Sequence, residues 1–315
     1  MPSPFGWLSA PSTLRVAVGM DARLSGPALK EACITALADC GLFVLDCGMA
    51  STPAMFMTTV SDQTHCDGAV MLTASHLPSD RNGMKFFTCQ GGLESGEITA
   101  LLRLSEGDLP RGRAGQVQTF DFISIYAEGL RQKIQQETGQ TQPLKGLKIL
   151  VDAGNGAGGF YAEKVLQPLG ADIQGSQFLE PDGHFPHHIP NPENAEAMQS
   201  LVDAVIRHNA DFGLIFDTDV DRVGAVDKGG VVLNKNRLIA AISAVLLRET
   251  PGAAIVTDSI TSTGLAEFIK AHGGIHRRFK RGYKNVINEA IRLNHAGQYT
   301  PLAIETSGHA ALKEN

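Results

Sequence analysis

The sequence of 315 residues lacks several features that would assign it to a specialised class of protein. No apolar run approaches the roughly 18 residues of a membrane-spanning helix, and the most apolar run, residues 238–247, is more typical of a buried helix. The amino terminus has no basic region, which argues against a secretory signal. No lysine- or arginine-rich tract offsets the net charge of -6, so neither a nucleic acid nor a membrane surface is an expected partner.

Cysteine is scarce, odd in number and confined to the first third of the chain. The five cysteines form none of the close pairs that a zinc ribbon or a redox motif needs. We therefore expect reduced, mostly buried thiols in a reducing compartment, either the cytoplasm or an organelle such as a plastid. The sequence gives no indication of an oligomeric state.

What is present is an ordinary soluble composition, 43% hydrophobic and 19% charged, in a chain long enough for two or three domains. Segments 14–21, 147–152 and 253–258 resemble one another, because each is an apolar run that ends in aspartate before a Gly/Ser/Thr-rich turn and a helix. This pattern predicts βαβ units and buried strands. We expect an α/β fold of tandem related domains with mixed, largely parallel sheets.

Two polar stretches are candidate domain boundaries, residues 135–143 and residues 249–252. They predict a first domain over 1–140, a second over 141–250 and the start of a third over 251–315. Because the third unit has few residues, we expect it to be incomplete.

Residues 73–78 and 82–85 contain a hydroxyl and a lysine around a proline- and glycine-rich loop. Ser75 follows a strand expected over 68–72, so its hydroxyl would lie at the carboxyl end of that strand, where open α/β sheets bind ligands. Lys85 could transfer a proton if its surroundings lower its pKa. A surface turn with an ordinary serine is the alternative.

Asp217, Asp219 and Asp221 alternate directly after a second expected strand, residues 212–216. Such carboxylates can converge on a hard cation, Mg²⁺ or Ca²⁺ rather than zinc. An EF-hand is excluded because its sixth and twelfth positions would hold arginine and lysine. A solvated acidic turn is the alternative. A hydroxyl, a metal cage and the adjacent Arg222 are the parts that phosphoryl transfer needs.

Other motifs are weaker. The pair Glu305 and Ser307 could hold sugar hydroxyls, whereas His309 is more typical of a structural histidine. The three histidines within 181–192 lie among prolines without ligand spacing and are interpreted as structural. The basic cluster 276–281 suits either a small phosphorylated ligand or a solvated patch. The glycines of 154–158 match a dinucleotide fingerprint only loosely, so NAD is not expected.

Five motifs in this order resemble the α-D-phosphohexomutase family of phosphoglucomutases, phosphomannomutases and phosphoglucosamine mutases. The phosphoserine, metal and sugar loops of that family are matched at 73–85, 217–222 and 305–309. Two further motifs are matched at 18–26 and 182–193. Ile304 stands where the family usually has glycine, and Met20 where it often has arginine.

The resemblance implies a role for each matched residue. Catalytic roles fall on Ser75, His76, Lys85 and Arg222, and Mg²⁺ on a phosphoserine oxygen at Ser75 with Asp217, Asp219 and Asp221. Substrate binding falls on Arg23, Lys280, Gly282, Tyr283, Lys284, Glu305 and Ser307.

The activity implied is an intramolecular phosphotransfer between C1 and C6 of a hexose phosphate, with hexose 1,6-bisphosphate as intermediate and activator. Which hexose is preferred stays open. Two alternatives remain: an aspartate-nucleophile sugar phosphatase, whose signature residues 214–219 imitate, and a non-catalytic sugar-phosphate-binding fragment.

The chain departs from the family pattern at both ends. The family's initial G-T-x-G-x-R segment does not precede Leu14, and the chain stops before a fourth, phosphate-holding domain. The resemblance therefore implies a fragment of a longer mutase, with weak or no activity alone, because a phosphate anchor that positions the substrate would be missing.

Overall fold

The computed structural model describes residues 14–107, 114–233 and 235–313. The amino-terminal stretch that was considered for a secretory signal lies outside the described residues. Backbone contacts divide the chain into two compact units that meet in sequence at Asp221 and Arg222. None of the described helices has both the length and the apolar character needed to cross a bilayer.

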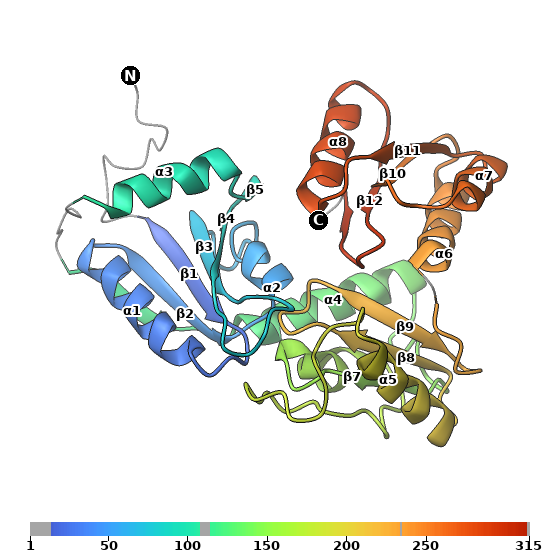
Figure 1. Ribbon diagram of the computed structural model, residues 1–315, viewed down its shortest axis with the longest axis horizontal. Helices are drawn as coiled ribbons and strands as arrows, with labels where there is room; N and C mark the ends of the chain where they lie inside the picture. The colour runs from blue at the N-terminus through green and yellow to red at the C-terminus, as the bar shows by residue number, and fades with distance from the viewer. Residues whose placement is uncertain (1–13, 108–113, 234, 314–315) are drawn as a thin grey trace. The chain divides into compact units, whose positions relative to one another are not determined.

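The first unit contains a six-stranded sheet with the order β5-β4-β3-β1-β2-β6 (Figure 1). Strands β1, β2, β3 and β6 run parallel, and β4 and β5 continue antiparallel from β3. The strands are β1 Arg15–Met20, β2 Phe43–Met49, β3 Gly68–Leu72, β4 Met84–Thr88, β5 Gly91–Gly92 and β6 Gln116–Thr119. The helices of this region are α1 Gly26–Asp39, α2 Thr52–Met57, α3 Ser95–Ser105 and α4 Phe122–Thr138.

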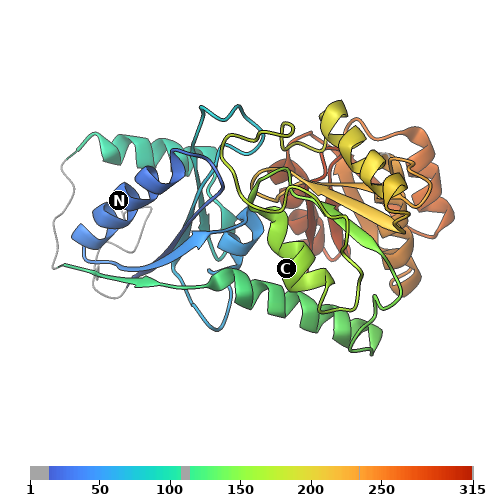
Figure 2. The ribbon, with the colours of Figure 1, turned by 90° about the horizontal axis from the view of Figure 1, so that it is seen from below.

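The central strands are buried on both faces, as their uninterrupted apolar runs predict. Val16 and Val18 on one face of β1 pack with Ile34 of α1. Ala17 on the other face packs with Met55 of α2 and Phe122 of α4. Figure 2 shows α1 and α4 on opposite sides of these strands.

A second parallel pair, β7 Ile149–Asp152 and β8 Phe212–Phe216, completes the first unit with α5 Ala195–Arg207. The helix expected after β7 is present with irregular winding, because the chain forms the 3₁₀ turn η2 Ala157–Gly159 and the π-helical segment η3 Tyr161–Leu166. Gly158 lies so close to Phe216 that a Cβ there would meet its ring at 3.1 Å, and this tight packing accompanies the irregular winding.

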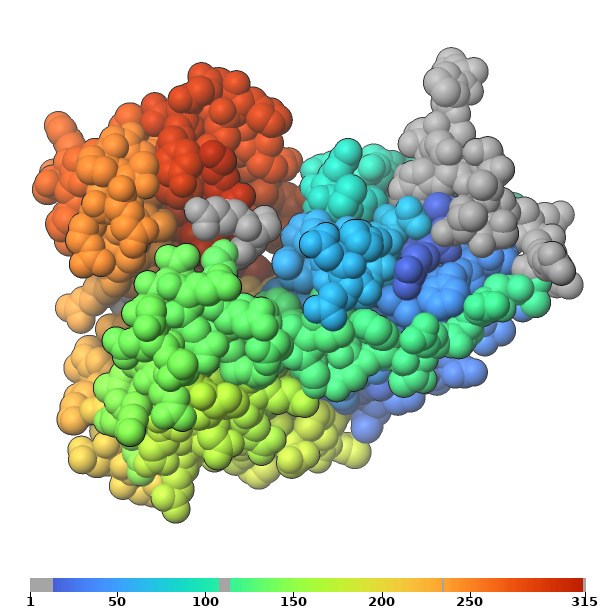
Figure 3. Space-filling model, turned by 180° about the vertical axis from the view of Figure 1, so that it is seen from behind, coloured from blue at the N-terminus to red at the C-terminus, as the bar shows by residue number. Residues whose placement is uncertain are grey.

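Helix α4 belongs to two cores of the first unit. Its first residue, Phe122, packs under the first sheet, whereas Ala127 packs with Val165 and Leu169 near β7. The helix ends at Thr138, so the polar boundary stretch 135–143 begins inside it. In the space-filling view, α4 (green) adjoins the residues around the first sheet (blue) and those around β7 (Figure 3).

The second unit has a four-stranded sheet with the order β11-β10-β12-β13, in which only β13 is antiparallel among the described strands. The elements of the second unit are β9 Val223–Asp227, α6 Lys235–Glu249, β10 Ala254–Asp258, α7 Thr263–Ala271, β11 Ile275–Phe279, α8 Tyr283–His295, β12 Leu302–Ile304 and β13 Ala310–Leu312.

Ile239 and Leu247 of α6 share one core with Ile255 of β10, so α6 packs with elements that follow it. The limits 1–140, 141–250 and 251–315 stay a prediction. Helix α6 is buried on one side only, since Val245 is 50% exposed.

The five cysteines are free thiols, as expected, but fewer are buried than expected. Cys47 and Cys66 are buried, Cys33 and Cys40 are half-buried, and Cys89 is exposed. Burial raises the pKa of the Cys47 thiol to about 12 and that of Cys66 to about 11, which keeps both protonated and unreactive.

His188 forms a buried ion pair that makes stability depend on pH. Its Nε2 lies 3.0 Å from Oδ1 of Asp152, and the two side chains are 1% and 0% exposed. Burial alone would lower the pKa of His188, but the carboxylate of Asp152 outweighs it and the pKa is raised above 6.5. The charged pair therefore contributes its full stability below pH 6.5 and loses it as the pH rises through the raised pKa.

We expect His188→Gln to cost about 3 kcal/mol of unfolding free energy at pH 6, because it leaves Asp152 buried without its partner. The difference from wild type should shrink as the pH rises. Urea unfolding of both proteins from pH 6 to pH 9 measures it. A difference that does not change with pH would contradict the charged pair.

Candidate active site

The Ser75 loop is anchored where β1 and β3 end together. These strands are in register at Met20 and Leu72, so the next residues, Asp21 and Thr73, leave the sheet side by side. Thr73 Oγ1 donates to Asp21 Oδ2 at 2.7 Å and accepts from the Ser75 backbone N–H at 2.8 Å. Burial raises the pKa of Asp21, although the hydrogen bonds from Thr73 and Arg23 favour its charged form.

Ser75 itself has an unusual backbone conformation that aims its hydroxyl at the aspartates. Its φ angle is +50°, a region that residues other than glycine seldom adopt. Ser75 Oγ donates to Asp217 Oδ2 at 3.1 Å, across 142 residues of sequence. His76 is exposed, with Nδ1 3.4 Å from Ser75 Oγ. The structure thus brings together the hydroxyl and the carboxylates that the sequence singled out separately.

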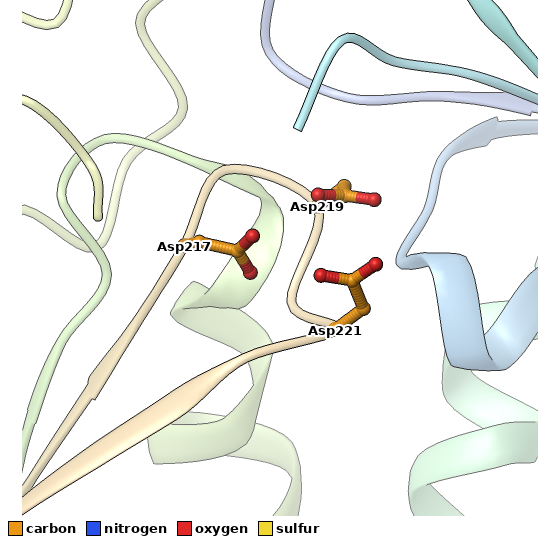
Figure 4. A group of neighbouring side chains, drawn as sticks. All are labelled: Asp217, Asp219 and Asp221. Atoms are coloured by element: carbon orange, nitrogen blue, oxygen red, sulfur yellow. The ribbon is translucent and has the colours of Figure 1, made fainter. Parts of the chain in front are cut away.

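The three aspartates come from one loop directly after β8, and their carboxylates turn toward one another (Figure 4). One oxygen from each of Asp217, Asp219 and Asp221 lies within 4.8 Å of the others. Val220 between them has a φ angle of +66°, which is strained for a β-branched residue. This bend lets alternate side chains converge instead of pointing to opposite sides.

The local hydrogen bonds leave part of this cluster unsatisfied. Oδ2 of Asp219 accepts from the Lys85 ammonium at 2.7 Å and from the Thr52 hydroxyl. Oδ1 of Asp219 is buried and has no hydrogen-bond partner. A buried carboxylate oxygen without a partner is costly, and a set of carboxylate oxygens is what hard divalent cations bind. The residues therefore fit Mg²⁺ or Ca²⁺.

Lys85 differs from its expected state. Proton transfer by a neutral amine requires a lowered pKa, and burial does act in that direction. Ion pairs with Asp219 and Asp221, both at 2.7 Å, outweigh burial and raise the pKa above its ordinary value. In this arrangement Lys85 is an ammonium that balances the acidic loop.

Arg23 also differs from its expected role, since the structure turns it inward rather than toward a ligand. It is 1% exposed and paired with Asp21. Its guanidinium donates to carbonyl oxygens of the Ser75 loop, namely Ser75 at 2.5 Å, Leu77 at 2.8 Å, Pro78 at 2.6 Å and Arg81 at 2.9 Å. Arg23 therefore holds the loop in place through buried hydrogen bonds, a role that the sequence did not reveal.

In the second unit, the Glu305 loop forms a compact polar cluster. Glu305 accepts from the Gly282 backbone N–H at 2.5 Å and from Ser307 Oγ at 3.2 Å. His309 lies 2.9 Å from Ser307 Oγ and 3.4 Å from Glu305, with its ring near Tyr283. Burial would raise the pKa of Glu305, but these partners outweigh it and lower the pKa. His309 was interpreted as structural, and its contacts make it part of this cluster.

The same loop lies against the start of β9. Gly308 has a φ angle of +98°, and a Cβ there would meet the Val223 carbonyl oxygen at 2.9 Å. The neighbouring Arg222 is 8% exposed. Lys280 is exposed after β11, and Lys284 is half-buried in the first turn of α8. The roles of Arg222, Lys280 and Lys284 stay predictions.

Ser75→Gly should be more stable than Ser75→Ala by about 1 kcal/mol, because both lack the hydroxyl and only glycine adopts a positive φ without steric cost. Urea unfolding of the two variants measures the difference. Equal stability would mean that the loop carries no backbone strain.

Arg23→Lys should loosen the Ser75 loop, since one ammonium cannot reach the carbonyl oxygens that the guanidinium fork serves. We expect amide hydrogen exchange over residues 73–83 to rise by about tenfold or more, as expected when charge-assisted hydrogen bonds are lost. Arg81→Lys, an exposed change in the same loop, is the matched control. Unchanged amide exchange in Arg23→Lys would show that Arg23 does not hold the loop in place.

Known proteins resemble this chain over most of its length. Residues 5–103, 124–230 and 234–315 match the family models for phosphoglucomutase/phosphomannomutase alpha/beta/alpha domains I, II and III. A phosphomannomutase/phosphoglucomutase of Pseudomonas putida is 36% identical over 301 residues, or 95% of this chain. A phosphoglucomutase of Neisseria gonorrhoeae is 35% identical over 303 residues. The chain spans 62% of the length of each of these relatives.

Solved structures agree. A phosphoglucomutase/phosphomannomutase family protein of Burkholderia thailandensis is 30% identical, with a TM-score of 0.83 over 96% of this chain and 64% of its own. A putative phosphomannomutase of Thermus thermophilus, 24% identical with a TM-score of 0.80 over 95% of this chain and 67% of its own, shares the fold. With three successive domain models of one family matched in order, the chain belongs to the phosphoglucomutase/phosphomannomutase family, the α-D-phosphohexomutases.

Proposed function

We propose that this chain carries the phosphoryl-transfer site of a phosphohexomutase, which moves a phosphoryl group between C1 and C6 of a hexose phosphate. The observation that carries the proposal is the hydrogen bond from Ser75 Oγ to Asp217 Oδ2 at 3.1 Å. This bond joins the hydroxyl of Ser75, a residue with a strained backbone, to a cluster of carboxylates. The names of the relatives, phosphoglucomutase and phosphomannomutase, support the same reaction.

The transfer that we propose uses Ser75 as the carrier. A hydroxyl oxygen of the hexose phosphate attacks the phosphorus of phosphorylated Ser75, the bond from phosphorus to Ser75 Oγ breaks, and a hexose 1,6-bisphosphate forms. The sugar hydroxyl loses its proton and Ser75 Oγ gains one, so the step is balanced. After the bisphosphate turns over, its other phosphoryl group returns to Ser75. The free bisphosphate would therefore also serve as activator, because it phosphorylates Ser75.

The aspartate loop supports this step by charge. Asp217, Asp219 and Asp221 would hold Mg²⁺ together with an oxygen of phosphorylated Ser75. When bound, the cation neutralises charge on the transferring group. Lys85, an ammonium in this arrangement, is the candidate for giving a proton to Ser75 Oγ, whereas accepting the proton of the sugar hydroxyl would require its pKa to fall.

The remaining side chains would hold the substrate. Arg222 would contact it near the phosphoserine, and Glu305 and Ser307 would accept and donate hydrogen bonds to its hydroxyls. Contacts of Glu305 with Gly282 and His309 already fix the Glu305 carboxylate, so little ordering is needed on binding. His76, Lys280, Tyr283 and Lys284 complete the candidate set.

The aspartate-nucleophile phosphatase is less well supported. Its mechanism needs Asp217 to attack phosphorus, yet Asp217 Oδ2 accepts the Ser75 hydroxyl hydrogen bond. This contact favours serine as the group that meets the phosphate and the aspartate as a metal ligand.

Exposure of the Mg²⁺-loaded chain to glucose 1,6-bisphosphate should place phosphate on Ser75. Phosphopeptide mapping by mass spectrometry measures it, and the modification should survive acid. Ser75→Ala should abolish it, whereas Ser79→Ala, in the same exposed loop, should not change it. Asp219→Asn should slow it by at least tenfold, because a metal ligand is lost.

The same experiment separates the alternatives. An acid-labile adduct on Asp217 would indicate a phosphatase instead. If neither residue is modified, the proposed transfer fails, and an inactive fragment or a non-catalytic binder of sugar phosphates remains.

A further inference from the structure

We propose that Thr52 is a positioning residue for the metal site: its hydroxyl and backbone fix Asp219 so that one defined carboxylate oxygen is presented to the cation. This inference rests on the proposed metal site. Thr52 belongs to none of the five sequence motifs, and it precedes Asp219 by 167 residues.

Two contacts join Thr52 to the aspartate loop. Its backbone N–H donates to the carbonyl oxygen of Asp219 at 2.8 Å, and its Oγ1 donates to Oδ2 of the same residue. Both residues are buried, Thr52 at 9% and Asp219 at 0% exposure. One residue thus holds both the main chain and the side chain of Asp219.

The local sequence leaves this hydroxyl free for that purpose. Thr52 is the first residue of α2, and the side chain of the preceding Ser51 caps the helix by accepting from Ala54 N–H at 3.2 Å. Because Ser51 serves as the cap and Pro53 favours the first turn, Thr52 Oγ1 has no role within its own helix.

As a consequence, the two carboxylate oxygens of Asp219 have different surroundings. Oδ2 accepts from Thr52 and from Lys85, whereas Oδ1 is buried without a hydrogen-bond partner. A carboxylate whose rotation is fixed at one oxygen offers the other as a ligand without reorganisation. Hydrogen bonds of this kind, from residues that do not touch the metal, strengthen binding.

The test is isothermal titration of the 315-residue chain with Mg²⁺. Thr52→Val keeps the shape but removes the hydroxyl, and it should weaken Mg²⁺ binding by about tenfold, the usual effect of losing such a contact. Thr52→Ser keeps the hydroxyl and should bind as wild type does. Thr59→Val is the matched control, because the Thr59 hydroxyl is also buried but donates to Phe56 O at 2.7 Å within its own segment.

Thermal unfolding of each variant checks that it folds, and Thr52→Ala replaces Thr52→Val if the latter does not. Equal Mg²⁺ affinity in wild type and the hydroxyl-free variant, or equal losses in the Thr59 and Thr52 variants, overturns the role of Thr52 and leaves the metal site standing. Absence of Mg²⁺ binding in wild type overturns both. Normal Mg²⁺ binding without phosphate on Ser75 overturns the proposed transfer alone.

Discussion

Asp219 is the residue on which the order of the first unit's site depends. Its carboxylate accepts from Lys85 on β4, and its main chain and side chain accept from Thr52 at the start of α2. In sequence, Asp219 lies 134 residues after Lys85 and 167 residues after Thr52. A buried carboxylate must be compensated by charge or by hydrogen bonds, so the acidic loop after β8 is stable only where the first sheet supplies its partners.

The serine loop and the aspartate loop each contain a residue with a strained backbone. Ser75 and Val220 both have positive φ angles, at +50° and +66°. Each such residue costs of order 1–3 kcal/mol. Ser75 accepts from Arg23 at its carbonyl oxygen and donates its backbone N–H to Thr73 Oγ1, and these bonds hold it in that conformation. The stability of the sheets thus offsets the free-energy cost of a backbone geometry that an isolated loop would lose. The hydroxyl and the carboxylates are therefore oriented before any ligand binds.

Local patterns in the sequence were sufficient for strands β1, β3, β7, β8 and β10, and they singled out the candidate residues of the site. Apolar runs located β3 and β8, and parallel-sheet geometry implied that Ser75 lies at a carboxyl edge. The inward turn of Arg23, the raised pKa of Lys85 and the contact of Thr52 were not predictable, because each depends on partners far away in the chain. The π winding of η3 was not predictable for the same reason, since it accompanies contacts of Gly158 and Tyr161 with Phe216 that no local pattern encodes.

The repeat found in the sequence has a physical counterpart at the strand ends. Asp21 after β1 accepts from Thr73 of the serine loop, and Asp258 at the end of β10 accepts from Thr306 of the Glu305 loop, both at 2.7 Å. In each case β1 or β10 is paired in parallel with the strand that precedes the loop. A buried aspartate at one strand end thus ties down the loop that leaves its neighbour. The two loops differ in chemistry, one with a hydroxyl near carboxylates and the other with a carboxylate near a histidine. The repeated part is therefore the anchor, and the side chains beyond it determine what each loop does.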